Sequence, residues 1–193
     1  MKLPIVICSL LTQALVLQPA AAQTSEPAWV PQAKAVAMSV PPKLLAVLQE
    51  EIARSGPEGA ITVCRDQAPA MARAASEQSG WQVRRISLRN RNPKAVPDAR
   101  ERAALEDFDR RAAAGEPPAK LERAETVEKD GRTVQRYMRA LPTADLCLNC
   151  HGTPDRVSDA VTTRLKALYP DDRAVGYRAG EIRGAITLVR PAP

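Results

Sequence analysis

Five consecutive residues, Cys147-Leu148-Asn149-Cys150-His151, bring two thiols next to the only imidazole of the 193-residue chain. Two thiols separated by two residues can reach the two vinyl groups of one haem, and the residue that follows then places its imidazole beneath the iron. Both residue types are scarce here, with four cysteines and one histidine in all. The pattern therefore predicts one covalent haem c, attached through Cys147 and Cys150 and ligated by His151.

Two other sites could use the same residues. A closed tetrahedral zinc site needs four nitrogen or sulfur ligands, which Cys64, Cys147, Cys150 and His151 could supply, although the adjacency of Cys150 and His151 makes that geometry awkward. A C-x-x-C pair can also form a redox-active disulfide when it opens a helix beside a sheet. That alternative would leave His151 without a role.

The opposite axial position of an iron bound by His151 must be filled by another residue type or stay open, because the chain has no second histidine. The candidates are Cys64, Met38, Met71 and Met138. Cys64 and Met71 share the apolar face of one predicted helix at a rise of about 10.5 Å, so only one of them can reach the metal. Cys64 could equally be a small buried apolar residue. A cysteine thiolate opposite His would stabilise ferric iron and lower the reduction potential.

The N-terminus is typical of an export signal. Lys2 precedes an apolar run from Leu3 to Leu17, and an Ala-rich cleavage pattern ends at Ala22. Residues 1–22 are therefore predicted to be a signal peptide, which makes the protein periplasmic and its mature form free of a membrane span. Residues 23–40 are expected to be a flexible lead. Haem c attachment takes place outside the cytoplasm, so export and the haem motif agree.

The net charge of the chain indicates which class of partner it could bind. The net charge is +6, but aromatic residues make up only 3% of the chain and the arginines are scattered, so nucleic-acid binding is not expected. A redox or signalling protein with an acidic docking face fits better. Arginines cluster at Arg84, Arg85, Arg89 and Arg91, where guanidinium groups could pair with haem propionates. Arg89 and Arg91 are the candidates for cofactor binding, and a solvated basic edge is the alternative.

Hydrophobic periodicity predicts the elements that position these residues, and together they make an α+β fold. Helices are expected from 44 to 55, from 57 to 80, from 98 to 114 and from about 155 to 168. Strands are expected at 81–88, 121–129, 132–141 and 182–189, with Asp130-Gly131 as a two-residue hairpin turn. The cysteine cluster is expected in a loop after that hairpin, and Cys64 on the inward face of the second helix.

Several segments occur in the order seen in a known family. They are Ala60-Ile61-Thr62-Val63-Cys64, Arg85-Ile86-Ser87-Leu88-Arg89-Asn90-Arg91-Asn92-Pro93, Pro97-Asp98, Cys147-Leu148-Asn149-Cys150-His151-Gly152, Tyr169-Pro170-Asp171 and Gly180-Glu181-Ile182-Arg183-Gly184-Ala185. The chain resembles PAS-like domains that carry a single c-type haem, found as stand-alone periplasmic proteins and as sensor regions of bacterial signalling proteins. The resemblance implies a PAS-like antiparallel sheet with flanking helices over residues 41–193, and a cysteine thiolate, Cys64, as the second iron ligand.

The expected function is that of an exported monohaem, c-type cytochrome-like protein with His/Cys ligation, acting in single-electron transfer or redox sensing. A haem-based sensor, in which a small ligand or an oxidant displaces Cys64 and alters a partner contact, is the alternative. A structural zinc site is a weaker one. A peroxidase needs an acid-base group beside an open distal site, and the chain has no second histidine to supply it. The protein is therefore not expected to be an enzyme.

Overall fold

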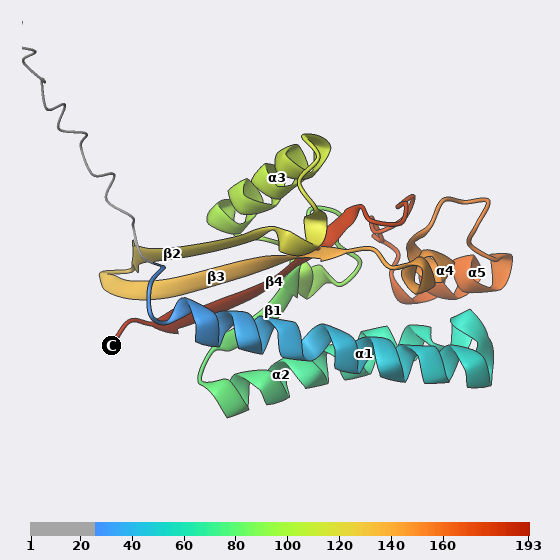
Figure 1. Cartoon of the computed structure of the whole chain (residues 1–193). Coiled ribbons are helices and arrows are strands. Elements are labelled where there is room, and N and C mark those ends of the chain that lie inside the picture. Colours follow the sequence, from blue (N-terminus) through green and yellow to red (C-terminus); the bar gives the residue numbers. More distant parts are fainter. Residues whose placement is uncertain (1–25) are drawn as a thin grey trace, which may run out of the picture.

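The computed structural model describes residues 26–193, so the predicted signal peptide at 1–22 lies outside the described residues. A four-stranded antiparallel sheet, in the order β1-β4-β3-β2, has helices on both faces (Figure 1). The expected α+β class is confirmed. No helix in the described range is long and apolar enough to cross a membrane. The main elements are α1 (Val30–Gly59), α2 (Ala68–Ser79), β1 (Gln82–Ile86), α3 (Ala99–Ala113), β2 (Glu122–Lys129), β3 (Arg132–Pro142), α4 (Leu148–His151), α5 (Asp159–Leu168) and β4 (Ile182–Pro191).

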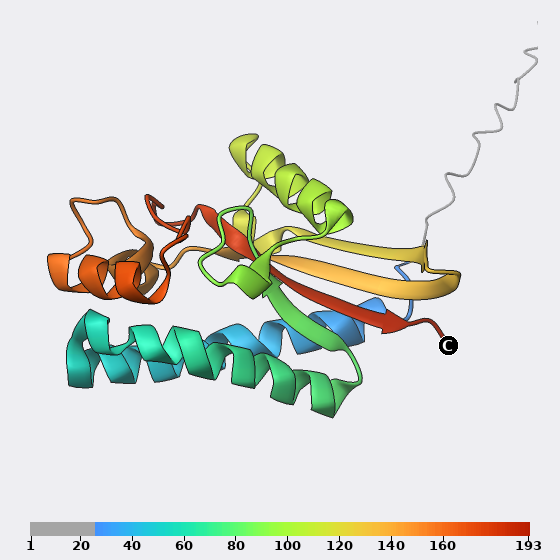
Figure 2. The ribbon, with the colours of Figure 1, turned by 180° about the vertical axis from the view of Figure 1, so that it is seen from behind.

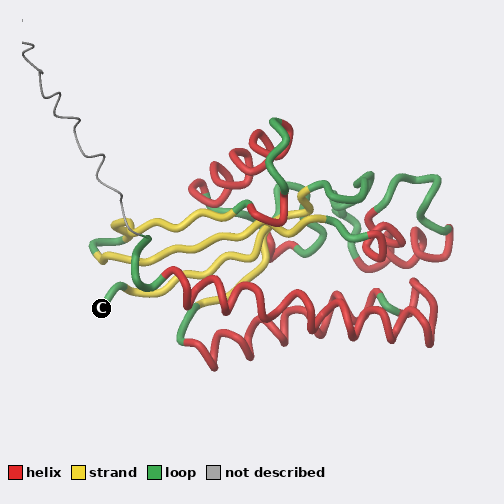
Figure 3. Tube along the Cα trace, in the orientation of Figure 1, coloured by secondary structure: helices red, strands yellow, loops and turns green. Residues whose placement is uncertain are grey.

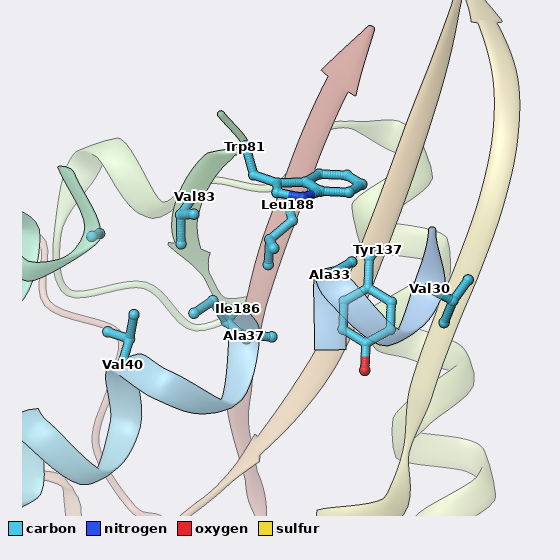
Figure 4. Packing of buried hydrophobic residues seen from close by; sticks show 10 residues of the cluster. Val30, Ala33, Ala37, Val40, Trp81, Val83, Tyr137, Ile186 and Leu188 are labelled. Atoms are coloured by element: carbon cyan, nitrogen blue, oxygen red, sulfur yellow. The ribbon is translucent and has the colours of Figure 1, made fainter. Parts of the chain in front are cut away.

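Helices α1 and α2 lie along one face of the sheet and α3 lies on the other, as the two opposite views show (Figure 1 and Figure 2). Residues 23–40 are predicted to be a flexible lead, but α1 begins at Val30, so residues 30–40 are helical. Ala33 and Ala37 are fully buried one helical turn apart, and their small side chains let the helix pack closely on Trp81 and Tyr137 of the sheet side (Figure 4). Burial of this apolar stripe stabilises the helix despite its prolines.

One carboxylate links α1 to two strands of the sheet. Glu122 on β2 accepts hydrogen bonds from Lys34 of α1 at 2.8 Å, from the Tyr137 hydroxyl at 2.8 Å and from Arg139 at 2.7 Å. Partial burial raises the pKa of Glu122, but the hydrogen bonds from Lys34 and Tyr137 and the nearby positive charges outweigh it, so the pKa lies below its usual range. Glu122 is therefore charged at neutral pH and holds the start of α1 against β2 and β3.

The connection between α1 and α2 is less regular than predicted. Gly56 leaves the helical conformation with φ of 70°, and the predicted continuous helix from 57 to 80 is interrupted by a π-helical turn at Val63–Gln67. That turn carries Cys64. Short π-helical turns often occur at functional sites. The predicted helix end at Gly80 is confirmed, since Gly80 adopts the left-handed conformation and its N–H donates to the Ser76 carbonyl oxygen.

Two other local predictions are confirmed, and the predicted start of α5 is corrected. Asp130 and Gly131 have φ of 51° and 72°, the two positive values that a tight hairpin turn between β2 and β3 requires. Helix α3 begins after Asp98, which forms a reciprocal capping box with Glu101. Helix α5 begins later than expected, because Ser158 caps it by accepting a hydrogen bond from the Val161 N–H.

Candidate functional site

The segment Cys147 to His151 lies at one end of the sheet, directly after β3, beside α5 and the loop before β4 (Figure 1 and Figure 3). It was expected in a loop, but it forms a short helical structure: a 3-10 turn at Asp145–Cys147 runs into α4. The helix ends at Gly152, whose N–H bonds the Leu148 carbonyl at 3.0 Å. A Cβ at Gly152 would lie 2.5 Å from that carbonyl oxygen, so the sharp exit after His151 requires glycine.

His151 is buried, with 7% of its surface exposed. Its Nδ1 lies 2.6 Å from the Ala174 carbonyl oxygen, which can only accept, so Nδ1 carries the proton and Nε2 keeps its lone pair. Burial, followed by the charges of Arg183 and Arg91, holds the pKa of His151 well below its usual range despite the opposing hydrogen bond to Ala174. A neutral imidazole oriented through one nitrogen is the form in which histidine binds metals.

Arg91 ties the loop 172–174 to α4. Its guanidinium group pairs with Asp172 at 2.8 Å and donates to the Cys150 carbonyl at 2.6 Å, and both side chains of the pair are about one tenth exposed, at 10% and 11%. Another Arg91 nitrogen lies 3.5 Å from His151 Nε2. Asp172 also accepts from the Ala174 N–H at 2.8 Å. Since Ala174 orients His151, the Arg91–Asp172 pair positions the imidazole through the loop.

The three described cysteines, Cys64, Cys147 and Cys150, are free thiols and each is half-buried. Burial raises the pKa of the Cys150 thiol to about 11, against the opposing charge of Arg91. This disfavours the Cys150 thiolate, which is the form that takes part in thiol-disulfide exchange. For the zinc alternative, residues 26–193 contain no group of three or more His, Cys, Asp or Glu side chains arranged to hold a metal ion.

Two neighbouring cavities open between α1, α2, the sheet and α4, with volumes of about 1030 and 1200 Å³ when the space at their mouths is included. The first is bordered by α1 and by both motif cysteines, and its wall is largely apolar. The second lies toward α2 and β1. The residues that line both cavities are Cys64, Arg85, Arg91, Leu141, His151, Tyr169 and Arg183. Cys64 and His151 are thus brought to the same space from segments far apart in the chain.

The methionines considered as ligands lie elsewhere. Met138 is buried on the α3 side of the sheet, Met38 is 49% exposed on α1, and Met71 packs with apolar residues of α1 and α2. None of them lines either cavity. Of the predicted candidates, Cys64 alone borders the cavities together with His151.

The two arginines predicted to bind a cofactor occupy different surroundings. Arg91 lines both cavities, but its guanidinium group is already paired with Asp172. Arg89 lines neither; it stacks on the Tyr177 ring at 4.1 Å from the centroid and donates to the Arg173 carbonyl. Arg183, which is not among the predicted cofactor-binding residues, borders both cavities. Its position depends on an irregularity in β4 that no local pattern indicates.

The residues fit a haem by their chemistry. One apolar space is bordered by a neutral histidine with an unprotonated Nε2, by two thiols at the spacing for vinyl attachment and by a further thiol. Ligand sites of this kind are concave, mostly apolar and furnished with a few converging polar groups.

Comparisons with known proteins agree on one family. The family model described as Tll0287-like matches residues 11–191. Among solved structures, the crystal structure of the cyanobacterial haem protein Tll0287 is similar to this chain, with a TM-score of 0.65 and 24% sequence identity over 88% of this chain and 98% of that one. This similarity shows a shared fold. None of the curated proteins matches. The chain belongs to the Tll0287-like family.

Proposed function

We propose that this is an exported haem c protein in which Cys147 and Cys150 attach one haem, and His151 and Cys64 ligate its iron. The observation that carries the proposal is the convergence of His151 and Cys64 on the same cavities, with His151 neutral and its Nε2 unprotonated. Family membership and the haem content of the related cyanobacterial protein support it. We also propose that the fold is PAS-like.

Cys147 and Cys150 supply the covalent links. Each thiol would add across one vinyl group, so that a carbon-sulfur bond would form as the vinyl double bond became single, with the thiol hydrogen going to the neighbouring carbon. No oxidant is needed and no atoms are lost. The proposed links require both cysteines in the thiol form, as they are in the described structure.

Cys64 and His151 set the electronic properties of the site. A bound haem supplies one-electron chemistry. The Cys64 sulfur, as a thiolate ligand, would place a negative charge beside the metal and so would favour the ferric state. Ala174 fixes the tautomer of His151 and makes its free nitrogen a better donor. We infer a low-potential centre.

We further propose single-electron transfer or redox sensing in the periplasm, after removal of residues 1–22, with an acidic redox or signalling protein as partner. The net charge of +6 supports such a partner by electrostatic steering. The proposed role is that of a carrier or sensor rather than an enzyme.

Expression of the full chain in a host that assembles c-type cytochromes tests attachment. The purified protein should be coloured, and its mass should exceed that of the mature chain by one complete haem. Cys147→Ser with Cys150→Ser should abolish the covalent addition. A colourless protein of unchanged mass would refute the proposal.

Replacement of Cys64 tests the second ligand. Cys64→Ser should shift the Soret band and remove the thiolate charge-transfer bands of the ferric protein, while Met71→Leu, a volume-conserving change on the same helical hairpin, should leave the spectrum as it is. Identical spectra for Cys64→Ser and the unmodified protein would return Cys64 to a packing role.

A second candidate is haem-based sensing of a small ligand. The observation in its favour is that Cys64 borders a second, open cavity toward α2, which offers space for a ligand that displaces it. Rapid binding of carbon monoxide or nitric oxide to the reduced protein would support sensing. A reduced spectrum indifferent to both gases would leave electron transfer as the function.

A further inference from the structure

The two cavities carry positive charges in their walls. Arginine and lysine side chains line them, and no aspartate or glutamate of the described residues does. These cations are Arg73, Arg84, Arg85, Arg91, Lys94 and Arg183. Placing several positive charges around an apolar space without a negative charge is unfavourable unless each is paired or solvated.

Two of the six are neutralised by neighbouring carboxylates. Arg84 pairs with Glu101 of α3, and Arg91 pairs with Asp172. Two others, Arg73 and Lys94, are exposed to solvent, where water stabilises their charge. Arg85 and Arg183 differ from all four. Both are half-buried, and neither side chain forms a hydrogen bond or an ion pair with any residue in the range 26–193.

The backbone is built to bring Arg183 beside Arg85. In the pairing of β3 with β4, Leu141 faces Gly184 and Pro142 faces Ile182, so Arg183 is an extra, bulged residue. A bulge redirects a side chain that regular alternation would send to the other face of the sheet. Gly184 makes this possible: its φ is 155°, and a Cβ there would lie 2.1 Å from the Ile86 carbonyl oxygen.

The two guanidinium groups repel each other. Burial, then the charge of Arg85, lowers the pKa of Arg183 to about 10. An anion that joins two such half-buried groups offsets their repulsion, because charges partly removed from water are normally paired. Two uncompensated positive charges match a ligand that carries two carboxylates.

We propose that Arg85 and Arg183 form a subsite that binds the two propionate carboxylates of the haem, and that their charges raise the reduction potential of the centre. This inference rests on the proposed function. It assigns the anion contacts to Arg85 and Arg183 rather than to Arg89, whose guanidinium group stacks on Tyr177. Planar guanidinium groups suit carboxylates because they can donate two parallel hydrogen bonds.

The test uses the holoprotein and the variants Arg85→Gln and Arg183→Gln, with Arg73→Gln as the matched control. Arg73 also lines the second cavity, so all three variants lose one positive charge near it, but Arg73 is exposed. Each subsite variant should shift the equilibrium toward the ferric form by about three- to tenfold. A tenfold shift equals about 59 mV for one electron. The control should shift it less than twofold.

A second readout reports the contact itself. The propionate bending bands in the resonance Raman spectrum respond to hydrogen bonding at the carboxylates, and they should move in both glutamine variants but not in the control. Arg183→Lys keeps the charge while losing the paired hydrogen bonds, so it should retain the potential and still move the band. If a glutamine variant fails to fold, Arg183→Lys still tests the hydrogen bonds to the propionates.

The outcomes separate the two proposals. Unmodified protein that carries no haem would overturn the proposed function and the propionate subsite with it. Haem-loaded glutamine variants with the potential of Arg73→Gln would overturn the subsite alone. The subsite would also be refuted if the potentials shift while the propionate bands stay fixed, because the arginines would then act only through space.

Discussion

The Arg91–Asp172 pair offers a direct test of how His151 is positioned. In Asp172→Asn the Arg91 guanidinium loses its counter-charge, although both side chains are only about one tenth exposed. Unit charges at about 4 Å near a protein surface attract by about 4 kcal/mol, and breaking a buried pair costs roughly 3–5 kcal/mol. Because asparagine can still accept one hydrogen bond, we expect a loss of about 3 kcal/mol.

Urea unfolding of the holoprotein, followed by far-UV circular dichroism, measures this loss as a shift in midpoint at constant slope. Asp107→Asn is the control, since Asp107 pairs with Arg110 on the exposed surface of α3 and should cost less than about 1 kcal/mol. The visible haem band of Asp172→Asn should also change before the circular dichroism does, because the loop that holds His151 opens locally. Equal losses in the two variants would refute the reasoning.

Three further predictions concern the scaffold. Glu122→Gln should lower the free energy of unfolding by about 1 kcal/mol at neutral pH; because the folded pKa is depressed, the difference should fade as the pH falls below the ordinary pKa of a glutamate and vanish below the folded one, as acid titrations of both proteins would show. Gly184→Ala should cost at least about 2 kcal/mol and alter the haem spectrum, whereas Gly180→Ala, also at positive φ but with open space around it, should leave the spectrum unchanged. Val30→Ala should cost about 2 kcal/mol in thermal unfolding, against less than about 0.5 kcal/mol for the exposed Val96→Ala.

Features fixed by neighbouring residues could be predicted from the sequence. The hairpin at Asp130-Gly131 and the helix end at Gly80 depend on backbone conformations that glycine and aspartate adopt locally. The same holds for the start of α3, where Asp98 and Glu101 stand at capping-box spacing. In each case the interaction that decides the structure lies within about one helical turn of the chain.

Features that depend on distant partners could not be predicted in the same way. Residues 30–40 contain three alanines and Pro31, and two more prolines, Pro41 and Pro42, follow directly. This segment forms a helix because Ala33 and Ala37 pack against the apolar side chains of Trp81 and Tyr137. The π-helical turn at Cys64 likewise follows from packing of two helices that the local pattern describes as one.

The arginines around the two cavities also depend on distant partners that the sequence does not reveal. Spacing along β1 places Arg84 and Arg85 on opposite faces of the sheet, which a period of two predicts. Whether either is neutralised depends on Glu101, which follows Arg84 by 17 residues and lies on the α3 face only. Arg183 is harder still, because its direction is set by the register shift opposite Leu141 and Pro142.

The positions of the carboxylates in the fold therefore decide which arginines are neutralised, and no single sequence motif indicates this. On the α3 face, Glu101 is 1% exposed and contacts both Arg84 and Arg136, so the cations there have a partner within the chain. On the α1 face, the described part of the chain offers Arg85 and Arg183 none. A fold that neutralises Arg84 and Arg136 with its own Glu101 and leaves Arg85 and Arg183 positive beside an apolar space is matched to an apolar ligand with anionic ends, and a haem with its propionates has that form.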